Sequence, residues 1–431
     1  MFTTPLSMRQ VAVLATIALF FMACGPETKE SLSQLHERWD HQNRPELFGF
    51  DRNSQSYAFT HQFADLPLEA QLTERPWSGD YWPTYKGGIT YRWDAPVEVE
   101  LAEDASDEER AAAYEKAQIK LYAYDLTDFD ELDAATIAKL SPAEKYDLYT
   151  GQRHYPLTTE ERQRTRILKT VPWLESYDAN FRIPTWEGLC HAWAPLVIHY
   201  KNPAPVVLEG ALGHQIPFGS SDIQALLNIF VHYDRGQTDF LGQRCNIDFS
   251  QLKTRRDSGE ITHEQFLAIA ENEHCKGTNA GAFHIVLANQ IALKNRSFVM
   301  DKTRDFEVWN QPIEAYTSEV VAEHEGASAG AAPGTVREVE LKTRVSYTTE
   351  IAHSYELYAP SYSTAYEYYH YRLELDGNDE IIGGAWISDN RPDFLWKQKI
   401  SDFYGRFHDL GKIYQASIAY LQKDEAKNSP K

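Results

Sequence analysis

The alternation of apolar and polar positions along the chain of 431 residues predicts a mixed α+β protein. Helices are expected at Asp107–Lys116, from Ser141 onward, at Ser220–Tyr233, Ser258–His274 and Phe394–Leu421. Short strands are expected at Phe283–Leu287 and Ser297–Asp301, and hairpins across Val336–Trp386, where β-branched and tyrosine residues alternate. The low-complexity segment Glu323–Gly334 predicts a surface loop.

The first apolar run, Val11–Ala23, has the length of a signal-peptide core and is too short to span a bilayer comfortably. It leads into Cys24, and the sequence around this cysteine is similar to a bacterial lipobox, although Phe21 and Met22 depart from the commoner residues. Ordinary cleavage after Ala23 is the alternative. We therefore expect an exported protein with a signal peptide and lipobox over residues 1–24 and a polar tether over residues 25–45. The main region, 46–425, is expected to form one or two subdomains, followed by a tail over 426–431.

If Cys24 carries a lipid, the protein is anchored to a bacterial membrane, with the outer membrane favoured, and faces the periplasm or the surface. The formal net charge of −21 argues against nucleic acid and anionic membrane surfaces as partners. Such a charge is compatible with cation binding but does not demonstrate it.

The first candidate catalytic residue is Cys190, in the stretch WEGLCHAWAP (Trp186–Pro195). Gly188 lies two residues before it, and a helix is expected to begin here. At a helix N-terminus the macrodipole and the free N–H groups favour a thiolate, and the same groups can receive an oxyanion. The alternative is a buried, inert cysteine, because free cysteine commonly behaves as a small hydrophobe.

A second candidate stretch is GAFHIVLANQIALKNRSFVMD, in which His284 opens one expected strand and Asp301 ends the next. Two adjacent antiparallel strands would bring both side chains to one edge of the sheet. A thiol, an imidazole and a carboxylate in this order are the parts of a Cys-His-Asp acyl-transfer site. His284 as a core residue and Asp301 as a turn cap are the structural alternatives.

The chain has four cysteines. With Cys24 assigned to the lipid and Cys190 to the site, Cys245 and Cys275 remain, and an exported compartment permits them to form a disulfide. Cys190 would then be the lone free thiol.

Several stretches, taken together and in this order, resemble the transglutaminase elicitor family of oomycetes and its bacterial relatives. They are Trp77–Trp93, Ser141–Gly151, Trp186–Pro195, Ser221–Leu227, Ala280–Asn289, Ser297–Asp301, Glu307–Ile313 and Ile381–Trp396. The resemblance implies protein-glutamine γ-glutamyltransferase activity through a cysteine acyl-enzyme, with a glutamine donor and an amine acceptor as partners, and with calcium dependence.

Carried over by residue, the resemblance makes Cys190 the nucleophile, His284 the general base and acid, and Asp301 the orienting carboxylate. Trp309 is a weaker candidate, for oxyanion support or for lining the acyl tunnel. Glu314-Ala315-Tyr316 depart from the basic and aromatic residues of oomycete members, so recognition by plants is not implied.

No calcium ligands are named, because the acidic run from Asp125 to Asp133 lacks the glycine and terminal glutamate of an EF-hand. Asp222 is expected either to cap its helix or to join a cation site. The alternatives to a transglutaminase are a cysteine peptidase or amidase acting on peptides or cell-wall peptides, and a non-catalytic surface-binding protein. The natural substrate, the acyl acceptor and the oligomeric state are not determined by the sequence.

Overall fold

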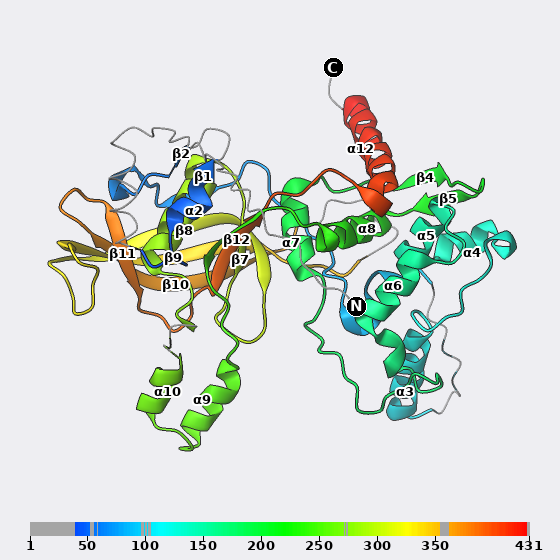
Figure 1. The fold of residues 1–431 in the computed structure, drawn as a ribbon, viewed down its shortest axis with the longest axis horizontal. Helices are drawn as coiled ribbons and strands as arrows, with labels where there is room; N and C mark the ends of the chain where they lie inside the picture. Colours follow the sequence, from blue (N-terminus) through cyan, green and yellow to red (C-terminus); the bar gives the residue numbers. More distant parts are fainter. Residues whose placement is uncertain are drawn as a thin grey trace, which may run out of the picture.

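Two lobes, one built on an antiparallel sheet and one on helices, meet at helix α7 (Cys190–His199) in the computed structural model (Figure 1). The structure describes residues 39–51, 56–57, 59–95, 99, 101, 105–270, 272, 275–353 and 362–428. The expected signal peptide, Cys24 and most of the expected tether lie outside these residues.

The sheet lobe is organised around an eight-stranded antiparallel sheet with the strand order β11-β10-β9-β8-β7-β12-β6. A short strand, β3 (Glu69–Gln71), pairs with β8 off this path. The other strands are β6 (Thr238–Gly242), β7 (Val299–Asp301), β8 (Asn310–Glu325), β9 (Arg337–Thr348), β10 (Thr364–Leu375), β11 (Ile381–Trp386) and β12 (Phe394–Gln398). Strands β8 to β11 form the meander that the alternation of residues 336–386 predicts, although β8 begins earlier. Helix α11 (Ala280–Leu287), α2 (Pro45–Gly49) and the apolar residues of the sheet form one core.

The helical lobe has its own core, formed mainly by α5 (Pro142–Tyr149), α7 and α8 (Ser220–Tyr233). It also contains α3 (Asp107–Ile119), α4 (Ala134–Lys139), α6 (Pro156–Thr165), the hairpin of β4 (Val206–Glu209) and β5 (Gln215–Phe218), and α12 (His408–Asn428). Ser141 and Glu144 form the expected capping box at the start of α5. Helix α7 packs on both α8 and β8, so it joins the two lobes.

Two buried charges connect α5 to α8 inside this lobe. Lys145 Nζ donates to Asp222 Oδ2 at 2.7 Å, and both side chains are fully buried. Asp222 Oδ2 also accepts from the Gly219 N–H at 2.7 Å, so this carboxylate caps α8. The capping alternative for Asp222 is therefore the one that the structure contains.

The expected strand at Phe283–Leu287 is wrong, because this segment forms helix α11. Asn279 caps the helix by accepting from the Gly281 and Ala282 N–H groups at 2.8 and 3.3 Å. The segment is apolar on all sides and buried between α2, β10 and β11, and a short run of this kind has no period that separates a strand from a helix. A Cβ on Gly281 would lie 2.2 Å from the Gly383 carbonyl oxygen, so glycine permits the close packing of α11 on β11.

Two expected helices are also corrected. Residues 258–274 do not form one helix, because α9 (Phe249–Asp257) ends at Ser258 and Gly259 adopts a left-handed conformation before α10 (His263–Ala270) begins. The start of Phe394–Leu421 is not helical either: Phe394–Gln398 forms β12 between β6 and β7. The three buried residues Phe394, Leu395 and Trp396 explain the strand, since both faces of β12 are covered.

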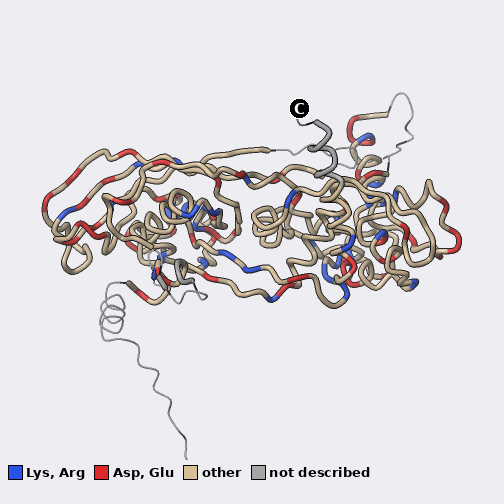
Figure 2. The backbone as a smooth tube through the Cα atoms, turned by 90° about the horizontal axis from the view of Figure 1, so that it is seen from above, with Lys and Arg blue, Asp and Glu red and all other residues tan. Residues whose placement is uncertain are grey.

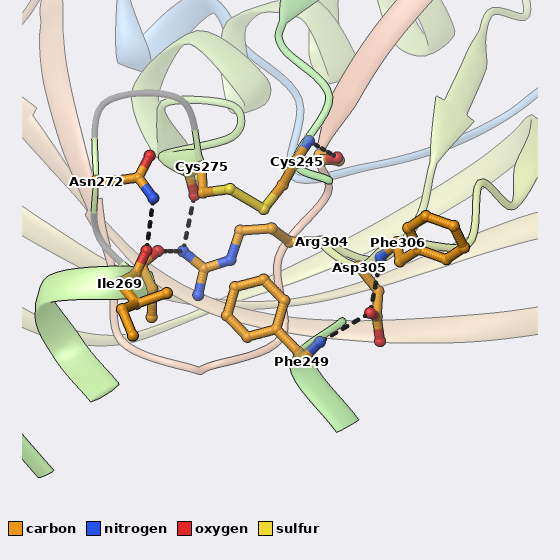
Figure 3. The surroundings of a disulfide bond; sticks show 10 residues. Cys245, Phe249, Ile269, Asn272, Cys275, Arg304, Asp305 and Phe306 are labelled. Atoms are coloured by element: carbon orange, nitrogen blue, oxygen red, sulfur yellow. Dashed lines mark hydrogen bonds between the residues drawn. A yellow bond between two sulfur atoms is a disulfide. The ribbon is translucent and has the colours of Figure 1, made fainter. Parts of the chain in front are cut away.

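Cys245 and Cys275 form a disulfide that joins the two ends of the segment containing α9 and α10 (Figure 3). Arg304 donates to the carbonyl oxygens of Ala270 and Cys275, each at 2.9 Å, and the Asp305 carboxylate accepts from the Phe249 N–H at 3.1 Å. The small apolar cluster around the disulfide is separate from the two main cores.

Acidic positions lie at both ends of the elongated molecule (Figure 2), in keeping with the net charge of −21. Within the described ranges, no helix combines the length and apolar character that crossing a membrane requires.

The disulfide leads to a prediction about thiol counts. In a Cys24→Ser protein that is denatured without reduction, a maleimide should label only Cys190, and reduction should expose Cys245 and Cys275 as well. Mass spectrometry of the intact and digested protein gives the count. Labelling of all three cysteines before reduction would contradict the pairing.

Candidate active site

The start of helix α7 is fixed by a close backbone contact between two segments. Leu189 N–H donates to the Tyr81 carbonyl oxygen at 2.6 Å, and Thr84 N–H donates to the Glu187 carbonyl oxygen at 2.9 Å. A Cβ on Gly188 would lie 2.4 Å from the Tyr81 ring and 2.7 Å from its carbonyl oxygen. Glycine is therefore required for the approach that places Cys190 at the first position of α7.

The thiol of Cys190 lies against residues 308–310, at the start of β8. Cys190 Sγ is 3.9 Å from the Val308 carbonyl oxygen, which accepts from the thiol, and 3.9 Å from Asn310 Nδ2, which donates to the sulfur. The Trp396 indole donates to Asn310 Oδ1 at 2.8 Å, and this bond orients the amide so that its nitrogen faces the sulfur. Cys190 is the first residue of α7, after the N-cap residue Leu189, and none of the described side chains caps this end of the helix.

The electrostatic surroundings keep this thiol protonated at neutral pH. Burial raises the pKa of Cys190 to about 11, the negative charges of Glu350 and Asp301 add to this effect, and the hydrogen bonds from Asn310 oppose it. The helix N-terminus alone therefore does not produce the low-pKa thiolate that the sequence suggested.

Asp301 lies on β7, as predicted, and it is fully buried. Its Oδ1 accepts from the Trp309 N–H at 2.9 Å, so the carboxylate fixes the loop that contacts the thiol. Burial raises the pKa of Asp301 well above its usual range, and the nearby Asp393 carboxylate raises it further. In this position Asp301 holds residues 308–310 in place rather than orienting an imidazole.

His284 is not brought to the thiol. It lies on α11 in the core of the sheet lobe and is fully buried. Its Nδ1 is 2.8 Å from the Tyr371 hydroxyl, and its Nε2 has no hydrogen-bond partner among the residues that the structure describes. Burial lowers the pKa of His284 to about 4, so the ring is neutral at physiological pH. The expected placement of His284 and Asp301 on adjacent strands is wrong, because the histidine segment is a helix.

Trp309, the weaker candidate, belongs to residues 308–310, the thiol loop, and 38% of its area is exposed at the surface. Its backbone N–H is bound by Asp301, and its indole N–H donates to Glu307 Oε2 at 3.2 Å. The indole ring is thus free to contact a ligand, whereas the backbone position is fixed.

Several polar residues around the thiol were not found from the sequence. Gln311 Nε2 donates to both carboxylate oxygens of Glu350, at 3.0 and 3.1 Å. Asp80 Oδ2 is 2.5 Å from His353 Nδ1, and the His353 ring stacks on Trp82 at 4.9 Å. These contacts join segments far apart in the chain. The sequence offered a signal for two of them: Asp80 lies in the stretch Trp77–Trp93 and Gln311 in the stretch Glu307–Ile313, both of which resemble the family.

No group of three or more His, Cys, Asp or Glu side chains is arranged as a metal site in the part of the chain that the structure describes. In the acidic run, Asp130 pairs with Arg153 and Asp133 caps α4, so these carboxylates are used in other contacts.

The site and the fold together define the class: an α+β protein with a free thiol at the N-terminus of a helix packed on an antiparallel sheet. The family described as transglutaminase elicitor matches residues 55–423. The chain belongs to this family.

One solved structure resembles the chain over most of its length. It is the crystal structure of the GP42 transglutaminase from Phytophthora sojae, with a TM-score of 0.54 and 23% sequence identity, covering 84% of this chain and 94% of that one. At this identity the likeness establishes the fold. No curated protein sequence matches the chain significantly.

The position of His284 leads to a prediction that separates a structural from a catalytic role. His284→Phe should lower the free energy of unfolding by about 1 kcal/mol, because the hydrogen bond to Tyr371 is lost. The rate at which iodoacetamide alkylates Cys190 should not change at any pH, because the imidazole does not contact the thiol. Chemical denaturation and alkylation measured by mass spectrometry test the two parts, and an altered alkylation profile would show that His284 reaches the thiol.

Proposed function

We propose that the protein is a thiol-dependent acyltransferase, a protein-glutamine γ-glutamyltransferase in which Cys190 forms a thioester with a glutamine side chain. The observation that carries the proposal is the position of Cys190: the free thiol belongs to the first residue of α7, and the Asn310 side-chain amide donates to its sulfur. The family to which the chain belongs supports the same chemistry.

In the proposed reaction, Cys190 Sγ attacks the glutamine γ-carbonyl carbon. The N–H groups at the start of α7 and the Asn310 amide are donors for the oxyanion that develops. Ammonia leaves, and a primary amine, such as a lysine side chain, attacks the thioester and restores the thiol. Asp301 and Trp396 act indirectly, because they hold the Val308–Asn310 segment and orient its amide.

A hydrolase with the same nucleophile differs only in whether water reaches the thioester. A non-catalytic binding protein is the second candidate, and a specific observation favours it. The pKa of Cys190 is raised to about 11, and no hydrogen bond joins the thiol to His284. An activity measurement decides between these candidates.

We further propose that the protein is exported and lipid-anchored through Cys24 to a bacterial membrane. The apolar run Val11–Ala23 and the lipobox-like sequence before Cys24 support this. Calcium dependence is implied by the family resemblance alone, and no step of the proposed reaction uses it.

The acyltransferase proposal predicts the behaviour of three variants. The wild-type protein should incorporate a labelled primary amine into a glutamine-containing protein and release ammonia. Cys190→Ala should abolish both signals, because the nucleophile is lost. Asp301→Asn should retain part of the activity, because it changes only the support of the thiol loop, and Glu340→Gln, far along β9, should match the wild type.

Ammonia release without amine incorporation, across several amines, would change the assignment to an amidase. Neither signal in folded protein, with or without added calcium, would favour the binding protein. Activity that survives Cys190→Ala would contradict the role of this cysteine.

The anchoring proposal predicts the effect of one substitution near the N-terminus. Fatty-acid labelling in a bacterial host should tag the wild type, and Cys24→Ser should lose the tag and leave the membrane fraction. A wild type that carries no label and fractionates as a soluble exported protein would indicate cleavage after Ala23 instead.

A further inference from the structure

Among the described residues, no histidine forms a hydrogen bond with the Cys190 thiol, so the group that takes its proton must be sought elsewhere. The side chains around the sulfur supply two carboxylates whose charges act on it, those of Glu350 and Asp301. Asp301 is fully buried, and its Oδ1 accepts from the Trp309 N–H and so supports the loop. Glu350 is partly exposed, and a side-chain amide binds both of its oxygens.

Two separate supports hold Glu350 and Cys190 in the same neighbourhood. On one side, Leu189 N–H donates to the Tyr81 carbonyl oxygen at 2.6 Å, and Ile351 N–H donates to the Gly79 carbonyl oxygen at 2.9 Å. Cys190 directly follows Leu189, and Glu350 directly precedes Ile351. Since Gly79 and Tyr81 are two residues apart, their backbone spans at most about 7 Å.

The second support is the start of β8, where consecutive residues serve the two groups. Asn310 donates to the thiol sulfur at 3.9 Å, and Gln311 donates to both oxygens of Glu350. Gln311 is buried, so its amide is held in a defined position. This arrangement resembles the usual relation between a catalytic base and the group that orients it.

We propose that Glu350 is the general base and acid of the Cys190 reaction and that Gln311 is its positioning residue. This inference rests on the proposed acyltransferase function. The Glu350 carboxylate takes the thiol proton as the bond from Sγ to the glutamine γ-carbon forms. When the tetrahedral intermediate collapses, the carbon–nitrogen bond breaks, and Glu350 returns the proton to the nitrogen that leaves as ammonia.

The second half of the reaction uses the same group in reverse. The amine attacks the thioester, its excess proton passes to Glu350, and the proton then returns to Sγ as the carbon–sulfur bond breaks.

Burial raises the pKa of Glu350 above its usual range. The charge of Asp80 raises this pKa further, and the charge of Lys302 lowers it. A carboxyl group with a raised pKa is better matched to proton exchange near neutral pH. The other titratable groups on which its charge acts are Cys190, Tyr81 and Tyr347.

The experiment compares the wild type with Glu350→Gln, which keeps the size of the side chain and its ability to bind the Gln311 amide. Glu340→Gln is the matched control, because the Glu340 carboxylate is also partly exposed but lies on β9 and is bound to His370. All proteins carry Cys24→Ser, so that Cys190 is the reactive thiol. Two quantities are measured: amine incorporation into a glutamine-containing protein, and the pH profile of Cys190 alkylation by iodoacetamide.

The two quantities should move in opposite directions in Glu350→Gln. The kcat of amine incorporation should fall by about 10²- to 10⁴-fold with little change in KM, because the proton acceptor is lost. Alkylation at pH 8 should become faster, because removal of the negative charge lowers a thiol pKa that stands at about 11 in the wild type. A purely structural defect would not produce this combination. Glu340→Gln should leave both quantities unchanged.

A Gln311→Met variant keeps the Glu350 carboxylate but removes the amide that binds it. This variant should lower kcat less than Glu350→Gln does. It also serves as the test if Glu350→Gln does not fold. The inference is overturned if kcat of Glu350→Gln equals that of the wild type, or if the alkylation profile does not change. A wild type that incorporates no amine and releases no ammonia would instead overturn the proposed function, and these outcomes are therefore distinguishable.

Discussion

The close packing of Gly188 against Tyr81 is the constraint on which the candidate site depends. Any side chain at position 188 would collide with the ring and backbone of Tyr81, so the two segments approach only because glycine has no Cβ. This contact determines where α7 begins, and α7 is the helix that packs on both lobes. The contact between Gly188 and Tyr81 therefore positions both the thiol, at the start of α7, and the helix that joins the two lobes.

The surroundings of the thiol differ from those of a pre-activated cysteine. Burial and two carboxylates raise the pKa of Cys190, and the Asn310 amide is the group that opposes them. A protonated thiol is a weak nucleophile until a base takes its proton, and it is less readily oxidised than a thiolate. In the proposed reaction, the Glu350 carboxylate, whose charge raises the pKa of the resting thiol, is the group that accepts its proton.

The support of this site extends well beyond the residues at the sulfur. Asp301 fixes Trp309, while the Asp393 N–H donates to the Asp301 carbonyl oxygen at 3.1 Å and the Asp393 carboxylate accepts from the Cys245 N–H at 2.5 Å. The thiol loop is thereby connected through β7 and the Asp393 segment to the disulfide. Burial raises the pKa of Asp393 to about 7, as expected for a carboxyl group in this interior position.

The sequence by itself determined the family, the helix boundaries that carry capping signals, and the placement of Cys190 at a helix N-terminus. Ser141 and Glu144 mark the start of α5, and Ser220–Tyr233 forms a helix with the predicted bounds, because caps and apolar periodicity are local properties. Only the tertiary structure decided that the His284 segment is a helix, since a short apolar run buried on all sides carries no period. It also decided the neighbours of the thiol. Asn310, Gln311 and Glu350 come together through the pairing of strands and backbone contacts distant in the chain, and no local pattern encodes such contacts.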